Sequence, residues 1–257
     1  MVAIVPLNAF DDNYIWAICD RENLTVVDPG QAEPVIEFLK NNPRLTLSAI
    51  LVTHNHYDHV GGVNALVDLY HPKVFASWQS SLSMITQPVR DGMACDTGLG
   101  DMNLVALEVP GHTKDHIAFY DKKDHLLFCG DTLFGCGCGR IFDSTVEALY
   151  DSLQKLAQLP EDTKVYAAHE YTQSNIAFAK EIEPDSKVLA KREKEVIALR
   201  KEGKPTLPSL IKTERKTNPF LRVDIPSVIA SVSRYAGQAL QSPLSVFTAL
   251  REWKNVA

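Results

Sequence analysis

The sequence lacks the features that mark several specialised classes of protein. No apolar run approaches the roughly 20 residues of a membrane-spanning helix, and no charged N-terminal segment precedes a long apolar one, as in a secretory signal. The net charge is −6, without the basic excess typical of nucleic-acid-binding proteins. Five cysteines among 257 residues do not suit a disulfide framework. We therefore expect a cytoplasmic protein with reduced thiols that binds neither membranes nor nucleic acids. We also expect a monomer.

The chain changes in character near His169. Before it, short β-rich runs alternate with a few helical segments, whereas the remainder is helical and charged, most clearly over residues 187–201. One earlier helix is well marked, because residues 144–147 read as a capping box and an apolar face follows over 146–157. There is no internal repeat and no low-complexity tract. The length of 257 residues also favours two domains.

What the sequence does contain is a dense group of metal-binding side chains. Three histidines and an aspartate follow an apolar run at residues 49–52 and precede Gly61 and Gly62: His54, His56, Asp58 and His59. Imidazole nitrogens and carboxylate oxygens are ligands for borderline divalent metals. The two glycines are typical of close backbone packing behind such a loop. The group therefore predicts a metal site.

Three further candidate ligands follow later β-like runs, namely His112, Asp131 and His169. Strands of one sheet bring the loops at their ends to a shared edge, so we expect all seven side chains to converge. A zinc-like ion takes about three or four protein ligands, so seven ligands predict two ions. Asp131 is the natural bridge, since a carboxylate offers two oxygens.

The alternation of side chains divides the ligands between the two ions. His54 and His56 are two residues apart in an extended segment and point to the same side, whereas His59 is out of phase. We assign His54, His56 and His112 to one ion. The other ion takes Asp58, His59 and His169.

These motifs resemble those of the metallo-β-lactamase superfamily. The ligand series comprises Thr-His-x-His-x-Asp-His with Gly-Gly (53–62), Pro-Gly-His-Thr (110–113), Gly-Asp-Thr (130–132) and Ala-His-Glu-Tyr-Thr (168–172). Further stretches are similar to one branch, glyoxalase II or hydroxyacylglutathione hydrolase: residues 12–14, 27–30, 137–140, 169–172 and 217–222. The resemblance implies an α+β fold, with a four-layer αββα sandwich over residues 1–169. A helical substrate-binding domain over 170–257 would follow.

The resemblance also implies a reaction. S-(2-hydroxyacyl)glutathione thioesters, typically S-D-lactoylglutathione, would be hydrolysed to glutathione and D-lactate, the second step in methylglyoxal detoxification. Two divalent ions, zinc or alternatively iron or manganese, would share a water and lower its pKa towards neutrality. Asp58 would bind metal and orient the resulting hydroxide. The substrate contacts implied by motif position are Arg140, Phe142, Tyr171, Arg251 and Lys254.

Some features carry alternative interpretations. Some relatives have Lys and Tyr at positions 140 and 142, so a hydroxyl contact to the substrate would be missing here. Cys136 and Cys138 suit either a glycine-rich loop with two thiols or a redox-sensitive pair. His116 is more typical of a residue behind the ligands, or in a strand, than of a ligand. The charged stretch 187–222 suits a solvated helical face or an anion-binding surface.

Arg251 and Lys254 lie three residues apart, on one helical face, and two cations near a C-terminus also suit an ordinary surface helix. For the whole chain, the alternative functions are another metallo-β-lactamase-fold hydrolase, a persulfide dioxygenase, or an inactive metal-binding module. Loss of ligands would indicate the inactive module, and all seven are present.

Overall fold

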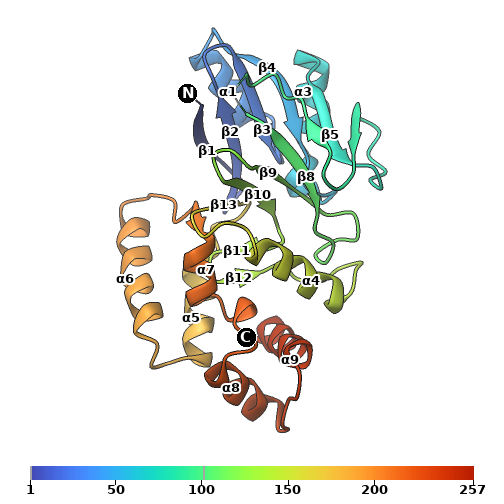
Figure 1. Ribbon diagram of the computed structural model, residues 1–257. Coiled ribbons are helices and arrows are strands. Elements are labelled where there is room, and N and C mark those ends of the chain that lie inside the picture. The colour runs from blue at the N-terminus through green and yellow to red at the C-terminus, as the bar shows by residue number, and fades with distance from the viewer. Residues whose placement is uncertain (1, 101) are drawn as a thin grey trace. The chain divides into compact units, whose positions relative to one another are not determined.

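The computed structural model describes residues 2–100 and 102–257, which form two compact units that interleave along the chain. The first unit comprises residues 1–109, 115–131 and 166–169, and the second comprises 110–114, 132–165 and 170–257. The last crossing between them falls between residues 169 and 170. Figure 1 traces the chain from blue to red through both units.

The first unit contains a sheet of mixed direction, in the order β1-β2-β3-β4-β5-β6. The strands are β1 (Ala3–Ala9), β2 (Asn13–Cys19), β3 (Asn23–Val27), β4 (Thr46–Leu51), β5 (Lys73–Ser77) and β6 (Gln87–Val89). The pairs β1–β2 and β2–β3 are antiparallel, whereas β3 to β6 run parallel. The carboxyl ends of β3 and β4 therefore lie side by side.

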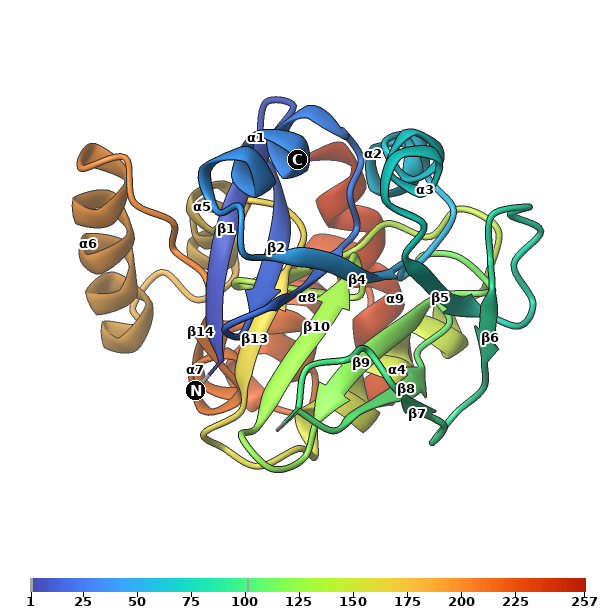
Figure 2. The same cartoon turned by 90° about the horizontal axis from the view of Figure 1, so that it is seen from above.

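Three helices belong to this unit: α1 (Glu33–Asn41), α2 (Tyr57–Val60) and α3 (Val63–Tyr70). Figure 2 shows α1 and α3 on the face of the first sheet that is turned away from the second sheet. Val35 and Leu66 of these helices pack with Val26 and Ile50 of the strands in one buried apolar cluster. This burial fixes the helices to the sheet.

The second sheet of this unit has the order β13-β10-β9-β8-β7. Its strands are β7 (Ala94–Cys95), β8 (Leu104–Glu108), β9 (Ile117–Asp121), β10 (Leu126–Gly130) and the end of β13 (Lys164–Ala167). Backbone hydrogen bonds join the two sheets at one edge, from Ile117 to Thr53 (2.9 Å) and from Tyr14 to Ala168 (2.7 Å). The segments after β4, β10 and β13, which carry predicted ligands, are thereby brought to a shared edge.

The second unit is mainly helical. Its elements are β11 (Leu133–Phe134), β12 (Gly137–Cys138), α4 (Val146–Ala157), α5 (Thr172–Ile182), α6 (Lys187–Lys201), β14 (Ser209–Leu210), α7 (Ile211–Thr217), the 3-10 helix η1 (Pro219–Leu221), α8 (Pro226–Ala236) and α9 (Pro243–Val256). This confirms the predicted α+β class and the helical C-terminal part. Across the described residues, no helix combines the length and apolar character needed to cross a membrane.

The predicted capping box before α4 is wrong by one residue. The N-cap is Thr145, and its hydroxyl accepts a hydrogen bond from the backbone N–H of Ala148 at 3.2 Å. Ser144 therefore lies outside the helix, and Glu147 is not at the position that would complete a capping box. The predicted apolar face is confirmed, because Leu149 and Leu153 are fully buried.

Candidate metal centre

The predicted ligand group follows β4 and continues into α2. The Nε2 atom of His54 lies 3.1 Å from the Nδ1 atom of His56. Close backbone packing positions this segment, because a Cβ atom on Gly62 would lie only 2.5 Å from main-chain atoms of residues 31 and 32. A Cβ atom on Gly61 would similarly lie 2.6 Å from the carbonyl oxygen of Gly30. The two glycines thus have the packing role predicted for them.

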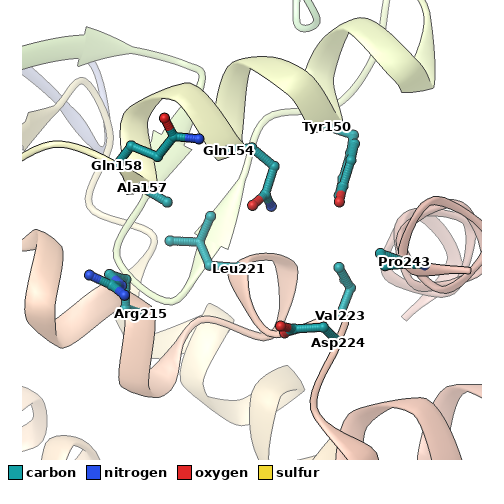
Figure 3. Close-up of a pocket in the computed structure, with 9 residues that line it drawn as sticks. All are labelled: Tyr150, Gln154, Ala157, Gln158, Arg215, Leu221, Val223, Asp224 and Pro243. Atoms are coloured by element: carbon teal, nitrogen blue, oxygen red, sulfur yellow. The ribbon is translucent and has the colours of Figure 1, made fainter.

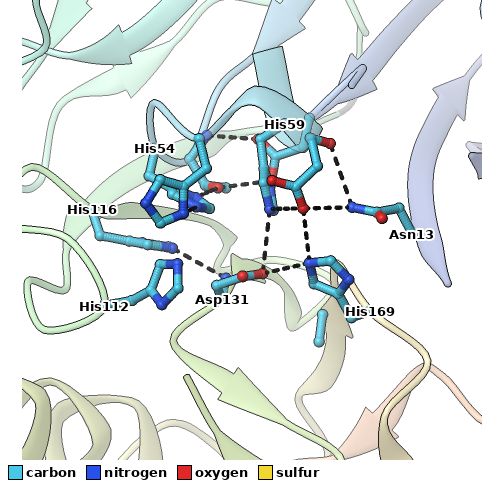
Figure 4. Close-up of polar contacts among 12 residues, drawn as sticks. Asn13, His54, His59, His112, His116, Asp131 and His169 are labelled. Atoms are coloured by element: carbon cyan, nitrogen blue, oxygen red, sulfur yellow. Dashed lines mark hydrogen bonds and ion pairs between the residues drawn. The ribbon is translucent and has the colours of Figure 1, made fainter. Parts of the chain in front are cut away.

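Four predicted ligands from three segments turn their polar atoms towards one point. The Nε2 atom of His59 lies 3.4 Å from Asp58 Oδ2 and 3.5 Å from Asp131 Oδ1. The Nε2 atom of His169 lies 3.3 Å and 3.4 Å from the same two oxygens. Figure 4 shows His59, Asp131 and His169 facing one another.

These separations suit a shared cation better than direct hydrogen bonds. Ligand atoms that surround a zinc-like ion tetrahedrally at 2.0–2.1 Å lie about 3.3–3.4 Å from one another. The buried Nε2 atom of His59 makes no hydrogen bond despite its two carboxylate neighbours. The sets His54, His59, Asp131 and Asp58, His59, His169 each bring ligand atoms within 4.8 Å of one another. The residues present therefore fit a divalent metal.

The other ring nitrogen of each histidine is held by a nearby acceptor or hydroxyl. His59 Nδ1 lies 3.0 Å from Asp28 Oδ2, and His169 Nδ1 lies 2.7 Å from Asp12 Oδ1. His54 Nδ1 lies 3.1 Å from the hydroxyl of Thr53. Carboxylates in such positions fix the tautomer and orientation of metal-binding histidines. The Nε2 atoms are thereby directed to the centre.

The roles of several of these supporting residues were not predicted from the sequence. Asp28 follows β3 directly and accepts hydrogen bonds from the backbone N–H of Thr53 (2.8 Å) and its hydroxyl (2.7 Å). Asn13 donates its side-chain amide to Asp58 Oδ2 at 3.1 Å. Asp12, Asn13 and Asp28 belong to motif stretches that carried the resemblance, and this was the available signal. His116 accepts the backbone N–H of Asp131 at 3.1 Å, in agreement with a place behind the ligands.

The electrostatics of the group also favour a cation. Burial opposes ionisation of Asp131, but the charges of His59 and His169 hold its pKa well below the usual range. Burial likewise opposes protonation of His169, yet Asp131, Asp58 and Asp12 raise its pKa to about 10. The carboxylates thus attract positive charge, which protons or a metal ion can supply.

His112, the remaining predicted ligand, belongs to the second unit. Its Nδ1 atom lies 2.8 Å from the carbonyl oxygen of Arg140, and its ring lies edge-on to Phe142 with centroids 5.1 Å apart. The hydroxyl of Ser152 in α4 donates to the carbonyl oxygen of Pro110 at 2.6 Å, which fixes the loop. The assignment of His112 to an ion with His54 and His56 stays a prediction.

All five predicted substrate contacts also belong to the second unit. Arg251 is only 4% exposed, and its Nη1 donates to the carbonyl oxygens of Cys138 (3.0 Å) and Gly139 (3.2 Å). This burial rules out the surface-helix interpretation for Arg251. Burial and the charge of Arg251 lower the pKa of Lys254, and Arg140 acts in the same direction. Arg140, Arg251 and Lys254 thus form a local concentration of positive charge.

The remaining predicted substrate contacts are two aromatic residues, Tyr171 and Phe142, and two cysteines belong to the same unit. The ring of Tyr171, at the start of α5, lies edge-on to Phe134 with centroids 5.3 Å apart, whereas Phe142 is 64% exposed. Cys136 and Cys138 are buried free thiols. Burial raises the pKa of Cys136 to about 12, so its reactive thiolate is suppressed. The burial favours the loop interpretation over a redox pair.

A cleft of about 440 Å³ lies elsewhere in the second unit (Figure 3). Its lining includes Tyr150 and Gln154 of α4, Arg215 of α7, Asp224, and Pro243 of α9. None of the predicted ligands or substrate contacts is among its lining residues. We therefore assign it no part in the site.

Comparison with known sequences shows the family. Residues 9–169 match the family model described as "Metallo-beta-lactamase superfamily", and residues 170–257 match "Hydroxyacylglutathione hydrolase C-terminus". The chain is 45% identical over 255 residues to a hydroxyacylglutathione hydrolase of Nitrosomonas europaea, covering 99% of this chain and 96% of the relative. It is 47% identical to one of Vibrio cholerae, covering 99% of both chains. The chain belongs to the hydroxyacylglutathione hydrolase family.

Solved structures share the fold. ETHE1 from Myxococcus xanthus superposes with a TM-score of 0.67 at 23% identity, over 100% of this chain and 99% of the other. A second structure, TTHA1623 "in a di-iron-bound form", has a TM-score of 0.53 at 28% identity, over 65% of this chain and 91% of the other. The predicted metallo-β-lactamase fold with a helical hydroxyacylglutathione hydrolase C-terminus is confirmed.

Proposed function

We propose that this member of the hydroxyacylglutathione hydrolase family hydrolyses S-(2-hydroxyacyl)glutathione, with S-D-lactoylglutathione as the typical substrate. The observation that carries the proposal is the convergence of Asp58, His59, Asp131 and His169 at separations suited to a metal. Full-length relatives named hydroxyacylglutathione hydrolase support the substrate class. The products are glutathione and D-lactate, and the role is the second step of methylglyoxal detoxification.

The proposed metal centre contains two divalent ions, zinc or alternatively iron or manganese. In this centre Asp58, His59 and His169 would hold one ion, His54, His56 and His112 would hold the other, and Asp131 would offer a carboxylate oxygen to each. The di-iron form of TTHA1623 supports the count of two. When bound, such ions supply a water that is acidic enough to attack a carbonyl carbon at neutral pH.

The chain's own residues position the reacting groups. Asn13 holds Asp58 Oδ2 through its amide, so this carboxylate is oriented to accept a hydrogen bond from the attacking water. No nucleophilic side chain is required. The leaving thiolate has a pKa of about 8.5 in its free form, so it departs without strong help from a general acid.

We propose that residues 170–257, together with Arg140 and Phe142, bind the glutathione part of the substrate. Glutathione carries two carboxylates and an ammonium group, and cations bind carboxylates through charge-assisted hydrogen bonds. Arg140, Arg251 and Lys254 provide such charge, and Tyr171 adds a hydroxyl. Phe142 offers an exposed apolar surface near His112.

The decisive experiment measures thiol release by protein loaded with two equivalents of zinc. We expect S-D-lactoylglutathione to be hydrolysed, and the N-acetylcysteamine thioester of lactate, which lacks the glutathione carboxylates, to be a poor substrate. A β-lactam and glutathione persulfide test the alternative functions. No thiol release from any acylglutathione by fully loaded protein would contradict the proposal.

We further propose a cytoplasmic monomer. Five free cysteines suit a reducing compartment. Size-exclusion chromatography with light scattering gives the mass directly, and a dimer mass would overturn the monomer.

A further inference from the structure

A short loop connects the proposed substrate contacts to a proposed metal ligand. This hairpin loop, residues 134–140, runs through β12 and ends at Arg140. The carbonyl oxygen of Arg140 lies 2.8 Å from His112 Nδ1. The backbone N–H of Phe142 donates a hydrogen bond to the carbonyl oxygen of His112 at 3.0 Å. The backbone position at Arg140 therefore helps to set the orientation of the His112 ring.

Two side chains of the C-terminal part hold the other end of the hairpin loop. Glu214 and Asn218 are fully buried, one turn apart at the end of α7. Glu214 Oε2 accepts the backbone N–H of Cys136 at 2.7 Å. Asn218 Nδ2 donates to the carbonyl oxygens of Gly137 (2.9 Å) and Phe134 (3.3 Å), and it also lies 3.3 Å from Glu214 Oε2. Together they contact the backbone of the loop at residues 134, 136 and 137.

The hairpin loop has little room to adopt another path. A Cβ atom on Gly137 would collide with the side chain of Asn175 in α5, and one on Gly135 would collide with Thr172. Cys136 has a φ of 56°, a left-handed conformation that is unfavourable for a residue other than glycine. Such a conformation persists only where neighbouring groups determine it, and the hydrogen bond to Glu214 does so.

Glu214 is an acidic side chain that is fully buried. Its Oε1 atom is buried and makes no hydrogen bond. A buried acidic group is costly, so its place here depends on the hydrogen bonds that it accepts. Its carboxylate is, however, the group that satisfies the Cys136 N–H and fixes the left-handed turn.

We propose that Glu214 and Asn218 are positioning residues, which act through the hairpin loop to place Arg140 for substrate binding and to orient the His112 ring. The proposal rests on the hydrolase function proposed above. Arg251 holds the next two carbonyl groups of the same loop, so the loop is fixed from both α7 and α9.

The test compares Glu214→Leu, Glu214→Gln and Asn218→Ala in zinc-loaded protein. We expect Glu214→Leu and Asn218→Ala to raise KM for S-D-lactoylglutathione about tenfold, because small misplacements of binding groups have effects of this size. Glu214→Gln keeps an oxygen that can accept the Cys136 N–H and should retain a KM near that of the unmodified protein. The second readout is the Nδ1–H proton resonance of His112, assigned by its loss in His112→Gln, which should shift in the two disruptive variants only.

A matched control separates positioning from stability. Ile211→Ala removes a fully buried side chain from the same helix but leaves the hydrogen bonds of Glu214 and Asn218 to the hairpin loop in place. It should lower the melting temperature while leaving KM and the His112 resonance unchanged. If Glu214→Leu and Asn218→Ala behave like this control, the positioning role is wrong. If Glu214→Leu does not fold, Asn218→Ala decides by the same criteria. If the unmodified protein releases no thiol, the hydrolase function fails, and the His112 resonance still decides the positioning role.

Discussion

Asp28 shows how a single carboxylate can organise a metal centre without binding the metal. It contacts His59 Nδ1 and receives two hydrogen bonds from Thr53, whose hydroxyl also lies beside His54 Nδ1. The orientation of two predicted ligands, His54 and His59, thus depends on one buried side chain. Such supporting groups raise the basicity of metal-binding histidines and fix their orientation.

Replacing Asp28 should therefore weaken metal binding. We expect Asp28→Asn to lower zinc affinity about 10–100-fold, because the amide cannot accept at both oxygens. Competition with a fluorescent chelator measures the affinity. Asp121→Asn, which changes a fully buried carboxylate whose oxygen accepts hydrogen bonds from the backbone of residues 123 and 124, is the control. An unchanged affinity in Asp28→Asn would show that His59 does not need this support.

The exposed ring of Phe142 permits a gain-of-contact experiment. Phe142→Tyr adds a hydroxyl to an exposed ring, and the 64% exposure leaves room for it. We expect KM for S-D-lactoylglutathione to fall about fivefold, which corresponds to one hydrogen bond of about 1 kcal/mol, with kcat unchanged. Steady-state kinetics measures both constants. An unchanged KM would place the glutathione moiety away from this ring.

Among the secondary-structure elements, three ends in the C-terminal part meet at one carboxylate. Glu183 follows α5, and Arg222, which follows η1, donates to both of its oxygens at 2.9 and 3.0 Å. Ser227 in the first turn of α8 adds a hydrogen bond of 2.7 Å. Burial opposes ionisation of Glu183, but the hydrogen bonds from Arg222 and Ser227 outweigh it and lower its pKa.

Glu183→Gln should lower the free energy of unfolding at pH 7 by about 2 kcal/mol, as expected for charge-assisted hydrogen bonds. Because the folded pKa lies below the ordinary value of 4.5, this stabilisation is present above pH 4.5 and is lost as the pH falls through the lowered pKa. The difference between variant and unmodified protein should thus shrink in acid. Urea unfolding at pH 7 and pH 4 measures this difference.

The control variant is Glu193→Gln, which breaks the Lys180–Glu193 pair and should lower the free energy of unfolding by less than about 1 kcal/mol. An equal loss of stability in both variants would contradict the central role of Glu183.

The elements that sequence analysis predicted are those with a local signal. Strand-like runs followed by His112, Asp131 and His169 pointed to these residues as candidate ligands, because apolar alternation and a terminal polar residue are visible within a few positions. The partner of His169 is Asp12, 157 residues away, and no local pattern connects them. The burial of Arg251 could not be predicted either. Helical spacing places the residue on one face of a helix but does not show which part of the chain covers that face. The N-cap of α4 was missed because Ser144 and Thr145 are both good caps and only the backbone path selects one.

At the scale of the whole molecule, metal and fold should be coupled. Asp58 and Asp131 face each other across His59 and His169, so removal of a cation leaves negative charge concentrated in a largely buried group. A ligand that binds only the folded state stabilises it in proportion to the logarithm of its concentration over Kd.

Removing metal with dipicolinate should therefore lower the melting temperature and abolish thiol release. Re-addition of zinc should restore both. Differential scanning calorimetry before and after chelation measures the shift, and dipicolinate saturated with zinc is the control for effects of the chelator itself. A melting temperature that does not depend on metal would mean that the carboxylates are balanced by protons alone.

The interleaving of the two units has a practical consequence for protein engineering. Residues 170–257 look like a detachable module in the sequence, yet the compact unit to which they belong also includes 110–114 and 132–165. Glu214 and Asn218 in the tail complete hydrogen bonds of a hairpin encoded some 80 residues earlier. A chimaera that exchanges the tail at residue 170 would thus separate these partners, so grafting a new substrate preference onto this scaffold requires three segments to be transplanted together.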